Sequence, residues 1–389
     1  MRIFRALCTL FVLVLVGCGK YEGGAPVNTI VASLGIPANI EIWFTTTDEL
    51  DLQSIDREAF NVPIKEIVPE FGYSVIRFEG ILTTIGDEAF RGCFNIENIS
   101  LPHSVVKIGA RAFYDCINME CLTLGGGLRE CGSRAFDSCV NLISLHISSI
   151  ESWCNISFED SSANPAAITQ GLIVDGKKLT KLVIPDGVES INDYAFYNNT
   201  LLTSVEIPAS LRESGRRAFY GCDGINRVDI YDIDSWVAID FEEEVSNPLS
   251  FAEKLYWNGV KVEHLQLVNV KEISSYAFIN CTTIKSLVAD NFLQEIGVDA
   301  FRNCLALTTV TIGEGIKEIE ERAFMGCSML ENVTIYAIEP PILGDDCVFG
   351  YNAATRKIYV PSVALEAYKN YGDWARYITS LEGVSLLES

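Results

Sequence analysis

The stretch IGDEAFRGC, residues 85–93, contains the unit Ala-Phe-x-x-Cys, which returns throughout this 389-residue chain. Its Phe, or the Phe of a degenerate copy, recurs at Phe60, Phe90, Phe113, Phe136, Phe196, Phe219, Phe278, Phe301 and Phe324. Successive positions are separated by 30, 23, 23, 60, 23, 59, 23 and 23 residues. A spacing of 23 residues that occurs five times indicates a structural repeat whose stacked units bury one continuous core.

Each part of the repeat predicts a local structure. Phe and Cys are three residues apart, so one helical turn would place both side chains on the same inward face. The stretch LTSVEIP, residues 202–208, alternates apolar and polar residues, which is typical of a short half-buried strand. The sequence therefore predicts a β-rich repeat solenoid with short parallel strands and one short helical turn per repeat.

The two long intervals are related to each other. Residues 146–153, HISSIESW, match residues 229–236, DIYDIDSW, 83 positions later. The same offset relates Phe158 to Phe241, Asn164-Pro165 to Asn247-Pro248, and Gly176 to Gly259. We therefore expect a duplicated block of 83 residues, in which a long repeat (about 145–195 and 228–277) contains the break in the period.

Both ends of the chain depart from the repeat, and we expect caps there because a solenoid must cover its terminal core and strand edges. Strands are expected at 40–44, 75–80 and 357–361, a helix at 363–371, and a stop to the repeats at Pro340-Pro341. The expected organisation is a signal peptide (1–17), a tether (18–25), an N-terminal cap with a degenerate repeat (26–80), a solenoid (81–339) and a C-terminal cap (340–389).

The first residues have the pattern of an export signal. Arg2 and Arg5 precede an apolar run at 6–16, which is too short to span a bilayer but suits the apolar region of a signal peptide. The run ends in Leu-Val-Gly-Cys, which looks like a bacterial lipobox with Cys18 as the lipidated residue. An ordinary secretion signal with an incidental Cys is the alternative. With Gly19 after the Cys, we expect an exported lipoprotein in the outer membrane or at the cell surface.

Composition argues against several classes of function. The formal charge is -23, from 52 acidic and 29 basic residues, whereas nucleic acids and anionic membrane surfaces attract clustered Lys and Arg. The chain has three His, and it lacks Cys-x-x-Cys, Gly-x-Ser-x-Gly, Walker and Rossmann patterns. We therefore expect no catalytic residues, no metal site, no cofactor and no nucleic-acid partner, with contact to the membrane only through the N-terminal lipid.

Thirteen cysteines in an exported chain would permit disulfides. Seven of them share one repeat position, namely Cys93, Cys116, Cys139, Cys222, Cys281, Cys304 and Cys327. Because free Cys packs as a small apolar residue, we interpret this series as core. Cys121 falls on an outward strand position and is the thiol that we expect to be exposed.

Candidate binding residues lie in the middle of the chain. The expected outward strand positions hold a single Arg and no aromatic residue, which leaves Lys181, Arg227 and His264 as the candidate group. The duplicated Trp153 and Trp236 are the other candidates, because two exposed indoles would suit a sugar or a peptide. The alternative is that each Trp packs inside its long repeat.

The pattern resembles the BspA-type leucine-rich repeat family, whose 23-residue repeat reads Ile-Gly-x-x-Ala-Phe-x-x-Cys-x-x-Leu-x-x-Val-x-Ile-Pro. The resemblance extends from about residue 40 to the C-terminus, with Pro63 and Asn199 in place of the Cys. It implies a right-handed leucine-rich-repeat-like coil. The family includes surface adhesins and many members without an assigned role.

We therefore expect a monomeric, envelope-anchored lipoprotein that presents its surface for recognition of a protein or glycan. A structural or accessory lipoprotein of an envelope complex, with no ligand of its own, is the alternative. An enzyme has the least support.

Overall fold

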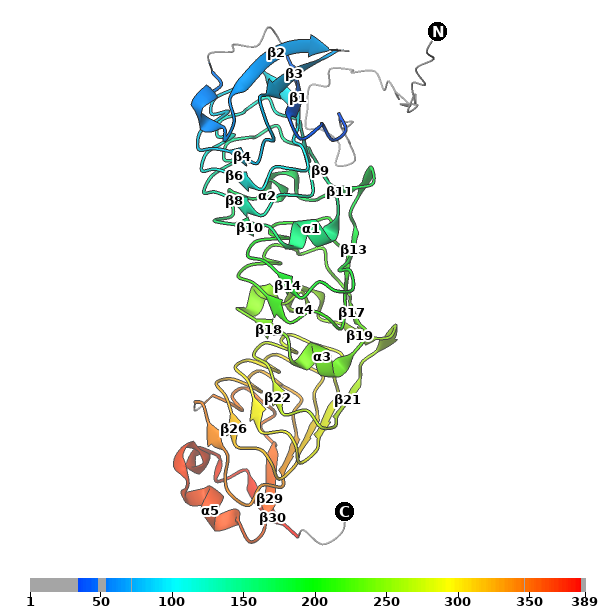
Figure 1. Ribbon diagram of the computed structural model, residues 1–389. Helices are drawn as coiled ribbons and strands as arrows, with labels where there is room; N and C mark the ends of the chain where they lie inside the picture. Colours follow the sequence, from blue (N-terminus) through cyan, green and yellow to red (C-terminus); the bar gives the residue numbers. More distant parts are fainter. Residues whose placement is uncertain (1–33, 48–53, 71, 346, 386–389) are drawn as a thin grey trace.

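The chain forms an elongated solenoid with an antiparallel strand unit at its N-terminal end and a small helical unit at its C-terminal end, as seen in a computed structural model (Figure 1). The structure describes residues 34–47, 54–70, 72–345 and 347–385. Cys18 and the expected signal peptide and tether lie outside the described residues. The repeat solenoid predicted from the sequence is confirmed.

One side of the solenoid is a row of mostly parallel strands, divided into three long sheets within the described residues. The first sheet has the order β12 (Lys177–Lys178), β11 (Ile173–Val174), β9 (Ser144–Ile147), β7 (Cys121–Leu124), β5 (Ile96–Ser100), β1 (Glu41–Thr46), β3 (Tyr73–Phe78) and β2 (Ile64–Glu70). The second has the order β13 (Lys181–Val183), β15 (Ser204–Ile207), β17 (Val228–Ile230), β19 (Leu255–Trp257) and β20 (Val260–Lys261). The third has the order β21 (His264–Leu267), β23 (Ser286–Ala289), β25 (Thr309–Ile312), β27 (Asn332–Ile335), β29 (Lys357–Pro361) and β30 (Leu381–Val384).

Two-residue strands form three further ladders in the described coils. The ladders are β4 (Thr84–Ile85), β6 (Lys107–Ile108), β8 (Glu130–Cys131) and β10 (Ser157–Phe158); β14 (Ser190–Ile191), β16 (Glu213–Ser214) and β18 (Asp240–Phe241); and β22 (Glu272–Ile273), β24 (Glu295–Ile296), β26 (Glu318–Ile319) and β28 (Ile342–Leu343). The α-helices are α1 (Ile150–Cys154), α2 (Ala166–Thr169), α3 (Ile233–Val237), α4 (Leu249–Ala252) and α5 (Leu365–Asn370), and the 3-10 helices are η1 (Arg57–Ala59), η2 (Glu244–Ser246) and η3 (Gly372–Tyr377).

The core is built on stacked phenylalanine rings, one from each standard coil. The rings of Phe90 and Phe113 are 5.1 Å apart with an interplanar angle of 5°, and those of Phe301 and Phe324 are 5.2 Å apart at 7°. The stacks are interrupted at the two long coils, where a Trp–Phe pair fills the core instead. The break in the 23-residue period is therefore a break in the ring stack.

The Ala-Phe-x-x-Cys unit is a run of hydrogen-bonded turns and not the expected helical turn. The Cys93 N–H donates to the Phe90 carbonyl at 3.1 Å, with Gly92 at φ 69°, the positive value of a type II turn. The Phe90 N–H and the Gly92 N–H instead donate to the next coil, at the carbonyls of Ala112 (2.7 Å) and Tyr114 (2.8 Å). In a helix these two amides would bond within the same coil. The hydrogen bonds between neighbouring coils therefore favour turns over a helix in this unit.

The repeated cysteines are core residues, as expected. The eleven cysteines among the described residues are free thiols, and the Cys222 Sγ–H donates to the carbonyl of Phe196 in the preceding coil at 3.0 Å. Burial raises the pKa of Cys222 to about 12, so its thiol stays protonated and unreactive. The prediction for Cys121 was wrong: all four residues of β7 are buried, and burial raises the pKa of Cys121 to about 12.

Each long coil adds a β-hairpin that ends its long sheet. Strands β11 and β12 pair across Asp175-Gly176, and β19 and β20 pair across Asn258-Gly259. Both turn residues have positive φ in each hairpin (50° and 70°, 50° and 79°), which is the type I′ geometry that favours Asn-Gly and Asp-Gly. The two hairpins project from the side of the long sheets in Figure 1. They are the main irregularity on an otherwise uniform surface.

The caps close both ends of the core. Strands β1 and β3 lie close to the two expected N-terminal strands, and β2 extends their antiparallel unit. The repeats continue past Pro340-Pro341, contrary to expectation, because β28 and β29 still pair with β26 and β27. These prolines precede β28, where no ladder hydrogen bond needs their missing N–H. At the C-terminal end, Trp374 is fully buried and donates its indole N–H to the Pro341 carbonyl at 2.7 Å.

Asn199→Cys is expected to raise the free energy of unfolding by about 1–2 kcal/mol. Asn199 occupies the repeated Cys position and is fully buried, yet neither its amide nitrogen nor its amide oxygen has a partner among the described residues. An unsatisfied buried polar group costs about 1–3 kcal/mol, and Cys fits the same position in neighbouring coils. Urea unfolding followed by circular dichroism measures the change, and a loss of stability would contradict it.

Glu320→Gln is expected to stabilise the chain by less than about 1 kcal/mol at neutral pH, the range of a partly exposed charge interaction. Burial, and then the neighbouring carboxylates beginning with Glu295, raise the pKa of Glu320. A carboxyl whose pKa is raised by folding destabilises the native state when it is charged, and this penalty disappears as the pH falls through that pKa. The advantage of Gln should therefore shrink in acid, and urea titrations at several pH values test this; a gain that grows in acid would contradict it.

Candidate functional site: the outer face of the second long sheet

The structure places two of the three residues of the candidate group, Lys181, Arg227 and His264, on or beside one sheet. Lys181 begins β13 and pairs with Ser204 of β15, and Arg227 immediately precedes β17, the next strand. His264 lies apart from them, because it begins the third long sheet, where its Nδ1 is 2.8 Å from the Ser286 hydroxyl. The candidate group is therefore divided by the hairpin of β19 and β20.

The sequence analysis missed aromatic residues that lie on and beside the same hairpin. Tyr256 aligns with Asp229 of β17, Tyr231 is 52% exposed just after β17, and Trp257 is 42% exposed. The expected outward strand positions go directly from Arg227 to His264, so they leave out β19, which lies between them in the chain. The signal was present in the sequence, because Asn-Gly between Tyr-Trp and Val-Lys is a strong hairpin pattern.

Six side chains on or beside β13, β15, β17 and β19 form one connected surface, which we call the platform: Lys181, Glu206, Arg227, Asp229, Tyr231 and Tyr256. The Tyr231 hydroxyl donates to Glu206 at 2.9 Å, and Glu206 also pairs with Lys181 at 2.5 Å. The Arg227 guanidinium makes two hydrogen bonds to Asp229, and its centre lies 3.9 Å from the centroid of the Tyr256 ring. Both cationic groups are therefore held in place before any ligand arrives.

The hydrogen bonds of the platform also set its protonation. Hydrogen bonding to Glu206 raises the pKa of Lys181 and that of Tyr231, and hydrogen bonding to Asp229 raises the pKa of Arg227. All three groups therefore keep their protons at neutral pH. They can therefore serve as hydrogen-bond donors.

The duplicated block provides an internal comparison. At the offset of 83 residues, Arg227, Tyr231 and Tyr256 correspond to Ser144, Ser148 and Ile173. Ser144 is buried, and so is Thr123, the counterpart of Glu206. The second block therefore carries Arg and Tyr at three positions where the first block carries Ser and Ile.

Trp153 and Trp236 do not belong to any surface, because each is only 1% exposed. Their rings lie 5.3 and 5.4 Å from those of Phe158 and Phe241. Their indole N–H groups donate to the carbonyls of Ala195 (2.7 Å) and Ala277 (3.0 Å). In standard coils the carbonyl of this repeated Ala accepts a hydrogen bond from the Phe N–H of the preceding coil. Each Trp indole N–H takes the place of that Phe N–H where the period breaks.

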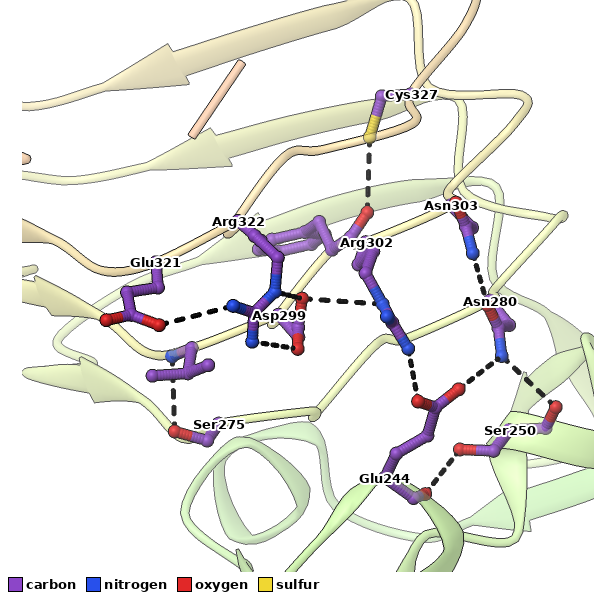
Figure 2. A network of polar contacts seen from close by, with 12 residues as sticks. Glu244, Ser250, Ser275, Asn280, Asp299, Arg302, Asn303, Glu321, Arg322 and Cys327 are labelled. Atoms are coloured by element: carbon purple, nitrogen blue, oxygen red, sulfur yellow. Dashed lines mark hydrogen bonds and ion pairs between the residues drawn. The ribbon is translucent and has the colours of Figure 1, made fainter. Parts of the chain in front are cut away.

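The Ala-Phe-x-x-Cys turns lie along one side of the solenoid, which we call the turn side. A second polar cluster, shown in Figure 2, lies among these turns. Asp299, whose side chain is 3% exposed, faces Arg322 at 2.9 Å and Arg302 at 3.4 Å. Arg302 also binds Glu244 of η2, which connects the second long coil to the coils that follow. Because Asp299 is enclosed and paired with both Arg side chains, this cluster stabilises the fold at the break in the repeat.

A groove of about 590 Å³ lies where the second long coil meets the third long sheet, between α3 and residues 269–275. It is lined by acidic residues of both parts, including Asp234, Asp240 and Glu272. Among the described residues, no three His, Cys, Asp or Glu side chains are arranged to hold a metal ion. No helix in the described part of the chain has the length and apolar character needed to cross a membrane.

Comparison with known families identifies the repeat. A profile described as "BspA type Leucine rich repeat region" matches residues 73–174, 166–240 and 250–366, in six copies. The chain belongs to the BspA-type leucine-rich repeat family. In this BspA-type protein, the matched residues cover more than half of the chain and include every strand of the second long sheet.

Several solved structures are similar to this BspA-type protein. A leucine-rich repeat protein from Bacteroides ovatus is 18% identical, over 83% of this chain and 91% of that one, with a TM-score of 0.35. A leucine-rich cell surface protein from Faecalibacterium prausnitzii is 20% identical, over 84% and 87%, with a TM-score of 0.39. The pneumococcal vaccine antigen PcpA is 16% identical, over 92% and 98%, with a TM-score of 0.41. A comparison with curated proteins found no match.

Proposed function

We propose that this chain is a cell-surface recognition protein, anchored by lipid at Cys18, that binds an extracellular ligand through the platform. The repeats hold six side chains on or beside four neighbouring strands, and curved repeat arrays commonly bind on exposed faces. The observation that carries the proposal is the difference between the two blocks. Only the second of the two equivalent sheet faces exposes Tyr and Arg, which are enriched in binding hot spots.

The platform supports binding and gives no support to catalysis. Its ion pairs and aromatic rings fix the positions of hydrogen-bond donors and flat apolar surfaces, which is the arrangement of a preorganised binding site. A lipoprotein that only supports an envelope complex would not need such a surface in one block alone.

A substitution taken from the chain itself tests the proposal. The variant R227S/Y231S/Y256I gives the second block the residues of the first, which the same backbone already accommodates. The purified chain, without its lipid, is applied to an array of extracellular-matrix proteins, envelope proteins and glycans. We expect binding that weakens at least about tenfold, or 1.4 kcal/mol, in the variant. Absence of binding, or equal binding by a folded variant, contradicts the proposal.

Cys18→Ala is expected to release the chain from the membrane fraction. The thiol of Cys18 would carry the lipid, and even two acyl chains suffice for stable anchoring. Fractionation of the producing cells measures how much of the chain is in the membrane fraction, detected by an affinity tag added at the C-terminus. Cys121→Ala is a matched control, because its thiol is buried in β7. Membrane association that persists in the Cys18 variant would contradict the lipid anchor.

A further inference from the structure

We propose that the ligand of the platform is a neutral glycan chain, lying across β15, β17 and β19. This inference rests on the proposed function, because it names the ligand class for the same surface. Charge, hydrogen-bonding capacity and ring exposure each support it. If uronic acid chains or peptides bind and neutral hexasaccharides do not, the occupant is instead an anionic polymer or a peptide.

The charge of the platform favours a neutral ligand. Its two cations, Lys181 and Arg227, each face a carboxylate, Glu206 and Asp229, so its net charge is 2 − 2 = 0, although the chain carries -23. An anionic ligand would have to compete with these carboxylates, and a cationic ligand with the two cations. Such an exchange of ion pairs yields little net affinity. A polar ligand without charge can bind while both pairs stay intact.

The hydrogen-bonding capacity that remains matches hydroxyl groups. An ammonium has three N–H donors and a guanidinium has five. Lys181 uses one on Glu206 and Arg227 uses two on Asp229, which leaves both groups with donors. The Lys181 and Arg227 side chains are 57% and 39% exposed, against 17% and 12% for their carboxylates. Donors therefore lie outermost, with acceptor oxygens behind them, and a sugar hydroxyl can use both.

The aromatic residues provide the apolar part of the surface. The hydroxyl bond to Glu206 on the neighbouring strand draws the Tyr231 ring across the sheet, where it stays half exposed. The Arg227 guanidinium lies on the Tyr256 ring and extends this flat layer. Flat rings beside fixed polar groups complement a pyranose ring, which has a C–H face and a hydroxyl edge. The row from Val183 to Tyr256 crosses four strands and is about 14 Å long, enough for a short oligosaccharide.

The opposite side of the hairpin supplies a control. Side chains alternate along a strand, so Trp257 points away from Tyr256, on the same side as its cross-strand partner Val260. Trp257 and Val260 are both exposed but lie outside the platform. Trp257 donates its indole N–H to the Tyr231 carbonyl at 3.3 Å, so the control is placed at Val260. Val260→Lys copies Lys177, its counterpart in the first block, and changes an exposed apolar side chain on this side of the hairpin.

Calorimetric titration with defined oligosaccharides tests the inference. The probes are linear hexasaccharides of glucose, mannose and galactose, the same lengths of uronic acid, and a peptide library. We expect a neutral hexasaccharide to bind and its affinity to fall at least about tenfold, or 1.4 kcal/mol, in R227S/Y231S/Y256I. We expect Val260→Lys to bind as the wild type does. The affinity should be nearly equal in about 0.05 and 0.5 M NaCl, because salt screens only charged partners.

The other outcomes separate the two proposals. Binding of the uronic acid chain alone, with a steep salt dependence, overturns the neutral ligand and leaves surface recognition in place. Binding of peptides alone, lost in R227S/Y231S/Y256I, has the same consequence. A loss of glycan binding in Val260→Lys moves the site to the other side of the hairpin and overturns the inference. If no probe binds the wild type and the array is also negative, both proposals fail.

Discussion

Phe219→Ala is expected to lower the free energy of unfolding by about 3–5 kcal/mol, the usual cost of removing a buried phenyl ring. Phe219 is fully buried, and its ring stacks on that of Phe196 at 5.4 Å. Between the Trp153–Phe158 and Trp236–Phe241 breaks, the described residues hold this one stacked pair of phenylalanine rings, so the cavity cannot be filled by another ring of the stack. Because each coil contacts its neighbours, local loss of order should spread to adjacent coils.

Urea unfolding followed by circular dichroism measures the effect of Phe219→Ala. Tyr220→Ala is the matched control, because Tyr220 is the next residue along the same turn and is 45% exposed. We expect the control to cost less than about 1.5 kcal/mol, the loss of its stacking contact with Tyr197 at 5.1 Å. A loss of the same size in both variants would contradict a core built on the phenylalanine stack.

Asp299→Ala is expected to cost about 3 kcal/mol. Removing one partner of a buried ion pair typically costs about 3–5 kcal/mol, because the other charge is left without compensation. Asp299 compensates Arg302 and Arg322 together (Figure 2). Both guanidinium groups keep some contact with water, with side chains 23% and 33% exposed, which places the expected loss at the lower end of the range.

Glu321→Ala is the control for Asp299→Ala. Glu321 also pairs with Arg322, at 3.2 Å, but its side chain is 52% exposed, and exposed pairs contribute about 0–1 kcal/mol. Urea unfolding of the two variants should therefore differ by about 2 kcal/mol or more. Equal losses would show that burial of Asp299 does not determine the strength of the cluster.

The sequence predicted the solenoid because its period is carried by residues that pack in only one way. Phe and Ala recur at fully buried positions, and the strand that follows alternates in and out of the core. The prediction of a helical turn was wrong. The spacing of Phe and Cys does not distinguish a helix from a run of turns, because the two side chains point the same way in both. The hydrogen bonds to the next coil decide between them, and these are not visible in one repeat.

The candidate site was only partly predictable. Lys181 and Arg227 were found because they break the pattern of small polar residues on the outward strand positions. Tyr231 and Tyr256 were missed because their strands are separated by a helix and a loop of the long coil, so no period relates them. Trp153 and Trp236 attracted attention by their duplication, but duplication reflects the break in the stack, which both blocks must fill.

Hydrogen–deuterium exchange of the chain, with and without the neutral hexasaccharide that binds in the titration, tests the central claim most directly. A ligand on the platform should slow exchange of backbone amides in β15, β17 and β19, because these strands carry its contacts and local opening would release the ligand. The account predicts slower exchange there and unchanged exchange in β7, β9 and β11 of the first block. Slowing in the first block, or on the turn side alone, would contradict recognition through the outer face of the second long sheet.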